Sequence, residues 1–329
     1  MIKFIIKRIL SLIPVIIGVT FVVFCINEFT PGDPVAALLG SEYTQEAYDA
    51  MYLKLGLDKP FIIRYLSYLW GIITEFDLGT CYQTKLPVKD LILDCFPITF
   101  QIVLYGVIIA MIVGIIIGII SAVKQYSIID YITTVIATFL TAIPTFWLAM
   151  MAVIIFSLRL GWFPPSGIDT LACWILPVVC VSCLPLSNIV RQTRSSMLEC
   201  IRQDYVRTAR AKGVEEKDVV LKHAFRNSLI PIITIIGMQV GVLMGGASMV
   251  METIFTIPGL GQLTLTAIQQ NNYPVIQGCT LFLSIVCSVC NLIVDVAYGY
   301  VDPRIKAQYV RANAKKKKAA KTEAKGVTA

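Results

Sequence analysis

Few side chains in this 329-residue sequence are suited to acid–base or metal chemistry. Charged residues make up 15% of the chain, and His223 is its single histidine. The sequence lacks the P-loop pattern G-x-x-x-x-G-K-[ST], the zinc-protease pattern H-E-x-x-H and the nucleophile elbow G-x-S-x-G. These absences exclude a P-loop ATPase, a zinc protease of that type and an α/β-hydrolase. We therefore expect no catalytic residue, no bound metal and no cofactor in this chain.

Long polar stretches are also rare, because apolar residues account for 57% of the sequence and its mean hydropathy is +0.75. Soluble domains contain about 45–50% apolar residues. Crossing a bilayer core of about 30 Å takes about 20 helical residues. Six apolar runs reach that length: 9–29, 98–123, 132–158, 171–190, 229–250 and 278–300. Since backbone amides in lipid need partners within their own segment, we predict an all-α integral membrane protein with six transmembrane helices.

Basic residues indicate how these runs are oriented. They gather before the first run, at Lys124, in the 191–228 loop and in the tail, whereas the opposite ends carry few. Positively charged loops stay in the cytoplasm, so we place both termini and the 191–228 loop inside and the 30–97 loop outside. The net charge of +7 follows from this topology. The charge gives no indication of nucleic acid binding, because no aromatic residues alternate with the basic residues.

Carboxylates are missing from the middle of the runs. Glu28 and Glu252 fall at outer ends, and Asp295 falls near the inner end of the last run. A proton-coupled carrier or channel is expected to place ionisable residues nearer mid-span. The sequence therefore describes a passage that another protein must drive.

The ten cysteines do not form a disulfide framework in a chain of this length. Two C-x-x-C pairs, at Cys180 and Cys287, have the spacing of metal ligands. No histidine or further cysteine clusters with them, and buried free cysteine acts as a small hydrophobic residue, so we interpret them as packing residues. Cys81 and Cys95 share the outer loop and could pair in an oxidising compartment.

The 191–228 loop carries a pattern for two short helices. Asp204 is a suitable N-cap for a helix over 205–212, and Gly213 follows as a C′ glycine would. A second helix is expected over 215–226, with Pro231 marking the start of the fifth run. Helices this short are unstable alone. From this pattern the loop is either an amphipathic element resting on lipid headgroups or a docking site for another protein.

The segment Tyr205-Val-Arg-Thr-Ala-Arg-Ala-Lys-Gly213, followed by Pro231, resembles the EAA-type loop of ABC importer permeases. Nine further motifs, in order over most of the chain, resemble the B-type membrane subunit of oligopeptide and dipeptide importers. They are Pro31-Gly-Asp-Pro34, Leu55-Gly-Leu-Asp-Lys-Pro60, Asp77-Leu-Gly79, Ile143-Pro-Thr-Phe-Trp147, Leu160-Gly-Trp162, Arg194-Ser-Ser-Met-Leu-Glu199, Phe255-Thr-Ile-Pro-Gly-Leu-Gly261, Tyr273-Pro-Val-Ile-Gln-Gly278 and Asp302-Pro-Arg-Ile305. The EAA triad itself reads Thr208-Ala209-Arg210 here, and the polybasic tail departs from the family pattern.

This resemblance implies a type I ABC importer permease in the bacterial cytoplasmic membrane. Such a subunit pairs with a second, related permease, while two ATP-binding subunits use ATP and Mg and an extracytoplasmic substrate-binding protein delivers cargo. The helix of the loop would then couple the ATPase to the membrane helices. The residues implied for this role are Asp204, Tyr205, Arg207, Thr208, Ala209, Arg210, Ala211, Lys212 and Gly213. Ala209 and Ala211 would permit close approach, and Arg207, Arg210 and Lys212 would form a charged rim.

Glycines recur every four residues along the fifth run, at Gly237, Gly241 and Gly245. A face without side chains favours tight helix packing over pore lining, although the two coincide in a heterodimer. Pro144 is expected to kink the third run or to mark a boundary in it.

We divide the chain into three regions. Residues 1–97 hold the first helix and an outer region, with helical periodicity over 46–55 and 62–73, that contacts a delivery protein or simply caps the spans. Residues 98–300 form the permease core, and the basic tail 301–329 is expected to be disordered against anionic lipid.

Peptides are the expected cargo of this architecture. The same architecture also carries nickel chelates, glutathione or oligosaccharides. The alternative from another class is a secondary carrier or membrane enzyme without ATPase partners.

Overall fold

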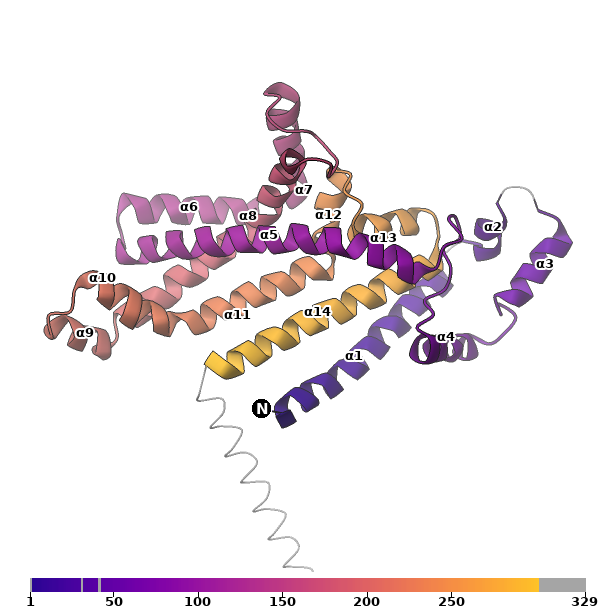
Figure 1. The fold of residues 1–329 in the computed structure, drawn as a ribbon, viewed down its shortest axis with the longest axis horizontal. Coiled ribbons are helices and arrows are strands. Elements are labelled where there is room, and N and C mark those ends of the chain that lie inside the picture. The colour runs from indigo at the N-terminus through magenta and orange to yellow at the C-terminus, as the bar shows by residue number, and fades with distance from the viewer. Residues whose placement is uncertain (1, 31, 41–42, 302–329) are drawn as a thin grey trace, which may run out of the picture.

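A computed structural model describes residues 2–30, 32–40 and 43–301 of the protein. Within these ranges the regular structure is helical, apart from one bridge between Thr80 and Pro87. The long helices lie side by side in a bundle. Short helices lie at its two ends, and the helical segment 145–159 projects from its side (Figure 1). Apart from Val301, the tail predicted to be disordered lies outside the described residues.

Five helices in the described ranges are long and apolar enough to cross a membrane. They are α1 (Ile2–Phe29), α5 (Val88–Val123), α8 (Leu171–Ile201), a continuous helix over Glu216–Ala247, and α14 (Tyr273–Val301). The continuous helix comprises α10 (Glu216–Asp218), the π-helical η2 (Val219–Phe225), α11 (Arg226–Val242) and the π-helical η3 (Leu243–Ala247). The prediction of an all-α membrane protein is confirmed.

The third predicted run is bent, not straight. α6 (Ile128–Ala142) meets the helix formed by α7 (Thr145–Ala152) and η1 (Val153–Arg159) at 101°. The break lies at Ile143, which is extended with φ −75° and ψ 128°. A residue before proline avoids the helical region, and Pro144 has no N–H to donate. The described chain therefore has six spans only if the bent pair crosses as one unit.

Most of the observed helices extend beyond the apolar runs from which they were predicted. α5 already begins at Val88 and passes through Pro97, and α8 continues beyond residue 190 to Ile201. Pro177 and Pro185 stay inside α8 and do not end it. The helical backbone continues past the apolar run because the additional turns pack on neighbouring elements at each end of the bundle.

The helices α5 and α8 run parallel to each other and form the centre of the bundle. A Cβ on Gly114 would lie 2.9 Å from Ile189 Cγ2, and one on Gly118 would lie 2.6 Å from Thr193 Cβ. The two glycines thus let the backbones approach more closely than any side chain would permit. α6 and α11 pack on α8, α14 packs on α11, and α1 lies outermost against α14.

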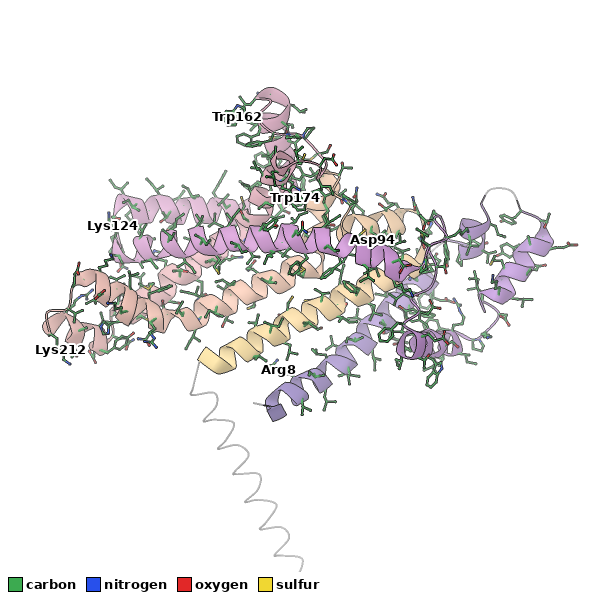
Figure 2. All side chains as sticks on the ribbon, in the orientation of Figure 1. Arg8, Asp94, Lys124, Trp162, Trp174 and Lys212 are labelled. Atoms are coloured by element: carbon green, nitrogen blue, oxygen red, sulfur yellow. The ribbon has the colours of Figure 1, made fainter. Side chains whose placement is uncertain are left out.

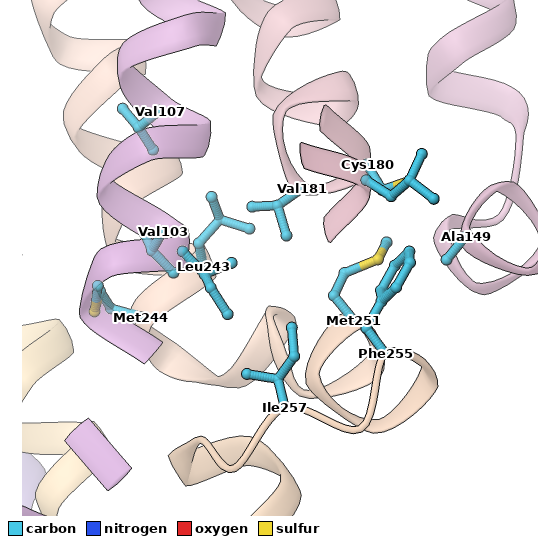
Figure 3. Packing of buried hydrophobic residues seen from close by; sticks show 12 residues of the cluster. Val103, Val107, Ala149, Cys180, Val181, Leu243, Met244, Met251, Phe255 and Ile257 are labelled. Carbon is cyan, nitrogen blue, oxygen red and sulfur yellow. The ribbon is translucent and has the colours of Figure 1, made fainter. Parts of the chain in front are cut away.

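The largest hydrophobic cluster joins these helices to the segment after η3. Val103 and Val107 of α5 and Val181 of α8 meet Phe255 and Ile257 (Figure 3). The segment contains α12 (Met249–Ile254) and α13 (Leu260–Gln269). The turn between them is buried in this core through Phe255 and Ile257.

Three short helices follow α1 at the end of the bundle opposite α9 (Asp204–Ala211). They are α2 (Pro34–Leu39), α3 (Gln45–Lys54) and α4 (Phe61–Glu75) (Figure 1). α3 and α4 agree with the helical periodicity predicted for the outer region. α4 is joined to α1 by Arg64, whose Nη1 lies 2.9 Å from Glu28 Oε1, and by a 3.1 Å hydrogen bond between the hydroxyls of Tyr65 and Thr20.

Candidate functional site: the loop between α8 and α11

The loop that carries the motif lies at one end of the bundle. Figure 2 shows Lys212 and Lys124 at this end, while Asp94 lies toward the other. The loop contains one regular helix, α9 (Asp204–Ala211), between the last turn of α8 and the start of α10. The structure therefore brings the motif residues together on one short helix at the end of the spans.

The start of α9 differs from the prediction at Asp204. The N-cap is Gln203, with φ −76° and ψ 151° and no side-chain cap, so Asp204 is the first helical residue. Its carboxylate is 99% exposed and lies 4.0 Å from Arg207 Nη1. Asp204 thus does not cap the helix. An acid in the first turn still interacts favourably with the positive end of the helix dipole.

The end of α9 matches the prediction for Gly213. Its φ is +77°, in the left-handed region that glycine adopts without strain. The Gly213 amide donates to the Arg210 carbonyl at 3.0 Å, and the Val214 amide donates to the Ala209 carbonyl at 3.3 Å. This pair of bonds is a Schellman motif, which ends a helix and fixes the direction of the chain that leaves it.

One face of α9 is buried against the rest of the protein. Val206 and Ala209, three residues apart, join a cluster with Ala122 of α5, Met197 of α8 and Val219 of η2. The helix is therefore attached to three separate elements and not only tethered at its ends. Ala209 was predicted to permit approach of a partner, but its side chain points into this cluster. Val206 was not predicted; its spacing from Ala209 was the available signal.

The opposite face of α9 is exposed. Tyr205 is 41% exposed, and Arg207, Thr208, Ala211 and Lys212 are also exposed. Arg210 is not free for a partner, because its guanidinium forms two bonds with Glu216, Nε to Oε2 at 3.0 Å and Nη2 to Oε1 at 2.7 Å. The surface offered by α9 is thus small and basic, with an aromatic ring beside it.

The predicted second helix is not a separate unit. α10, η2 and α11 follow one another without a break, and Pro231 lies inside α11. The π-helical turn of η2 places Val219, Val220 and Ala224 in the cluster with α9. The start of the span that follows therefore packs directly against α9.

A buried ion pair joins α8, the helix before the loop, to α6. Arg194 of α8 binds Asp130 of α6 through Nε–Oδ1 at 2.6 Å and Nη2–Oδ2 at 2.8 Å. Asp130 also accepts from the hydroxyl of Ser121 at 2.5 Å and from the amide of Tyr126 at 3.0 Å. The carboxylate is 3% exposed, so these bonds satisfy a charge that burial would otherwise destabilise. Sequence reasoning identified Arg194 as part of a motif but missed Asp130.

The three glycines predicted for packing or pore lining face α14. A Cβ on Gly237 would overlap a valine, while those on Gly241 and Gly245 would meet side-chain atoms at 3.1 and 3.6 Å. The neighbouring residues are Val294, Asn291 and Cys287, in that order. This face serves helix packing in the described structure. Pore lining by these glycines or by Pro144 stays a prediction.

Cysteines do not form a metal site within the described ranges, where no group of three or more His, Cys, Asp and Glu side chains is suited to a metal. Cys81 and Cys95 are both free thiols and do not pair with each other.

Two family profiles cover most of the chain. Residues 114–307 match the family described as binding-protein-dependent transport system inner membrane component, and residues 1–103 match the N-terminal part of such membrane components. The second profile ends within α5 and the first begins farther along the same helix.

Named relatives match along nearly their whole length. The dipeptide transport system permease protein DppB of Alkalihalophilus pseudofirmus is 38% identical over 93% of this chain and 100% of its own. DppB of Escherichia coli is 37% identical, and the oligopeptide transport system permease protein AppB of Bacillus subtilis is 38% identical, each over 93% of this chain and 99% of its own. An inward-facing structure of the methionine ABC transporter MetNI is 18% identical, with a TM-score of 0.47 over 65% of this chain and 94% of its own. On the profile match and the identity to these relatives, the chain belongs to the family of binding-protein-dependent transport system inner membrane components.

Proposed function

We propose that this chain imports di- and oligopeptides by alternating access. As a family member it is the permease component of an ABC importer in the cytoplasmic membrane, not an enzyme, and ATP is used by its ATPase partners. Peptide cargo is supported by one observation: the 37–38% identity to dipeptide and oligopeptide permeases extends over 93% of the chain. The alternative within this architecture is that the chain carries nickel chelates, glutathione or oligosaccharides instead of peptides.

The partners follow from the importer architecture. ABC importer permeases work with ATPase subunits and a binding protein. We propose two ATP-binding subunits on the α9 side, a second related permease beside this one, and a binding protein on the α2–α4 side. The basic residues support this topology, which puts both termini and α9 in the cytoplasm.

The exposed face of α9 is the proposed ATPase contact. Its ring and cations at Tyr205, Arg207 and Lys212 suit a groove lined with apolar and acidic groups. The buried face supports the coupling role, because Val206 and Ala209 hold α9 against α5, α8 and η2. A push on α9 would be passed to those elements as a rigid-body movement rather than absorbed by a loose loop.

The ion pair of Asp130 and Arg194 supports the same mechanism. It joins α6 to the C-terminal part of α8, the helix that leads to α9, so α6 would move with α8 when the ATPase subunits close. Because a bidentate pair has one preferred geometry, α6 and α8 would keep their relative position and move as a unit. This favours a switch between discrete arrangements of the helices over gradual bending.

Transport in a defined system tests the proposal. We would reconstitute the chain in proteoliposomes with its paired permease, both ATPase subunits and the binding protein, and measure uptake of a labelled dipeptide with ATP inside. Uptake that needs every component and is competed by unlabelled peptides is expected. ATP-driven uptake of a nickel chelate, glutathione or an oligosaccharide but not of peptide would reassign the cargo, and uptake by this chain alone would remove the ABC mechanism.

A further inference from the structure

A cavity of about 680 Å³ opens at the end of the bundle opposite α9. It lies between the last turns of α1, the α2–α4 region and the first turn of α14, which are grouped at that end of the molecule in Figure 1. Small-molecule sites commonly measure about 300–1,000 Å³, so the cavity has the size of a ligand site. The α9 loop lies at the other end and contributes nothing to it.

Three polar side-chain atoms in the cavity wall are buried without a partner in the described part of the chain. They are Asn27 Nδ2, Tyr68 Oη and Tyr273 Oη, from α1, α4 and α14. Burying a polar group without a hydrogen bond is costly, and most such groups in proteins are paired. Burial raises the pKa of Tyr68, so its hydroxyl keeps its proton and can donate. Three helices therefore each place one buried, unpaired hydrogen-bonding group beside this cavity.

In the cavity wall the two carboxylates have partners, whereas the two lysines have no ion pair within the described ranges. Glu28 pairs with Arg64 at 2.9 Å. Asp33 accepts from the Val35 amide at 2.8 Å and, through its other oxygen, from the hydroxyl of Tyr48 at 2.9 Å. The remaining charged groups of the wall are two exposed lysines, Lys54 and Lys59, for which no ion pair occurs within the described ranges. The cavity thus offers ammonium and N–H donors but few unengaged acceptors.

Aromatic rings make up much of the remaining wall. Phe24, Tyr52, Tyr68, Tyr82 and Tyr273 all line the cavity. Rings of this kind bind an apolar or aromatic side chain through their faces and edges. A ligand that satisfies both halves of the wall has a carboxylate and an apolar body.

We infer that this cavity is a binding site for the carboxylate end of a short peptide, separate from the site on the binding protein. The inference rests on the proposed function for the side of the membrane that the cavity faces. Lys59 would contact the carboxylate, and the Tyr68 and Tyr273 hydroxyls would reach it through side-chain movements on binding, since charge-assisted hydrogen bonds to an anion are the strongest that these groups can form. The site would hold released cargo next to the membrane helices.

Binding to the assembled permease complex in nanodiscs, without the binding protein, tests this inference. The probe is radiolabelled Ala-Phe, and the matched control ligand is Ala-Phe amide, which lacks only the carboxylate. Saturable binding of Ala-Phe is expected, with the amide weaker by about tenfold or more because it loses the charged contacts. Lys59→Gln and Tyr68→Phe should each weaken Ala-Phe several-fold, whereas Lys89→Gln, an exposed lysine outside the cavity wall, should not.

The inference is overturned if Ala-Phe does not bind, if the amide binds equally well, or if both cavity variants bind like the parent. Capture of the binding protein gives a second arm. If Lys59→Gln weakens that capture while free dipeptide does not bind, the cavity recognises an acidic side chain of the binding protein, and the inference is wrong. Peptide uptake by the full system, measured in parallel, separates these results from a failure of the proposed function.

Discussion

Glu252 holds the start of α13 through the amide of Gly261, which donates to its Oε2 at 2.7 Å. The next amide, of Gln262, donates to the same oxygen at 3.1 Å, and Glu252 is fully buried. Its other oxygen accepts from the hydroxyls of Thr99 at 2.9 Å and Ser248 at 3.0 Å. A carboxylate at a helix N-terminus is stabilised by the free amides and the helix dipole. Glu252 therefore connects α5, α12 and α13 at one point.

Glu252→Gln is expected to destabilise the protein. The new amide group would face either the Gly261 and Gln262 amides or the Thr99 and Ser248 hydroxyls, and the charge that strengthens all four bonds would be lost. Hydrogen bonds to charged groups contribute about 1.5–3 kcal/mol each, so a loss of about 2–4 kcal/mol is expected. Thermal unfolding of the purified protein in detergent measures it. The control is Glu46→Gln, an exposed acid of α3, and an equal unfolding temperature for the two variants would contradict the prediction.

The glycine face of α11 and η3 gives a matched pair of substitutions. Gly237→Ala would place a methyl group into Val294 of α14, whereas the nearest atom to a methyl on Gly245 is Cys287 Sγ at 3.6 Å, an ordinary contact. Overpacking of this kind costs about 1–3 kcal/mol. Gly237→Ala should therefore unfold at a lower temperature than the parent protein and Gly245→Ala close to it. Equal losses in both would mean that the glycines serve something other than this contact.

Local signals in the sequence predicted α9 well but not what α9 packs against. Alanines followed by a glycine indicate a short helix and its end, and both were predicted correctly around Gly213. The buried role of Ala209 depends on Ala122 and Met197, which come from helices far away in the sequence. No periodicity within 204–213 contains that information.

Pairing across the bundle was equally out of reach of the sequence. Asp130 and Arg194 are 64 residues apart, and neither has a sequence neighbour that indicates the other. Pro144 did indicate a break, because its effect on the preceding residue is local. The 101° bend that results depends on the packing of α7 against α8 and α12, which a single sequence does not show.

The brace between α6 and α8 predicts a large effect for Asp130→Asn. The variant leaves Arg194 partly buried with a weaker partner, and removing one member of a buried pair costs about 3–5 kcal/mol. Because the Arg194 side chain keeps 28% exposure, we expect a smaller loss of about 2–3 kcal/mol, at or below the lower limit of that range. Arg194→Lys should lose less, since it keeps the charge but not the bidentate geometry.

Asp130→Asn and Arg194→Lys should both lower the unfolding temperature and reduce transport. If the brace makes α6 follow α8, ATP-driven uptake should fall in Asp130→Asn more than the amount of assembled complex does. Arg202→Lys is the control, because Arg202 is exposed and donates a long hydrogen bond of 3.3 Å to Gln125. Full uptake by Asp130→Asn at normal assembly would show that the brace is structural only.

Substitutions at Gly213 can distinguish the effect of the backbone geometry at the end of α9 from the effect of the charge on its surface. Its φ of +77° is tolerated by Asn and Asp better than by other side chains, and a Cβ there would meet no atom within 4 Å. Gly213→Asn should therefore assemble and transport nearly as well as the parent. Gly213→Asp has the same shape but adds a negative charge beside Lys212, on the face proposed to meet the ATPase. It should assemble normally yet lose most peptide-stimulated ATP hydrolysis and uptake. Normal transport by Gly213→Asp would remove α9 as the coupling helix, and failure of both variants to assemble would place the effect in the turn itself.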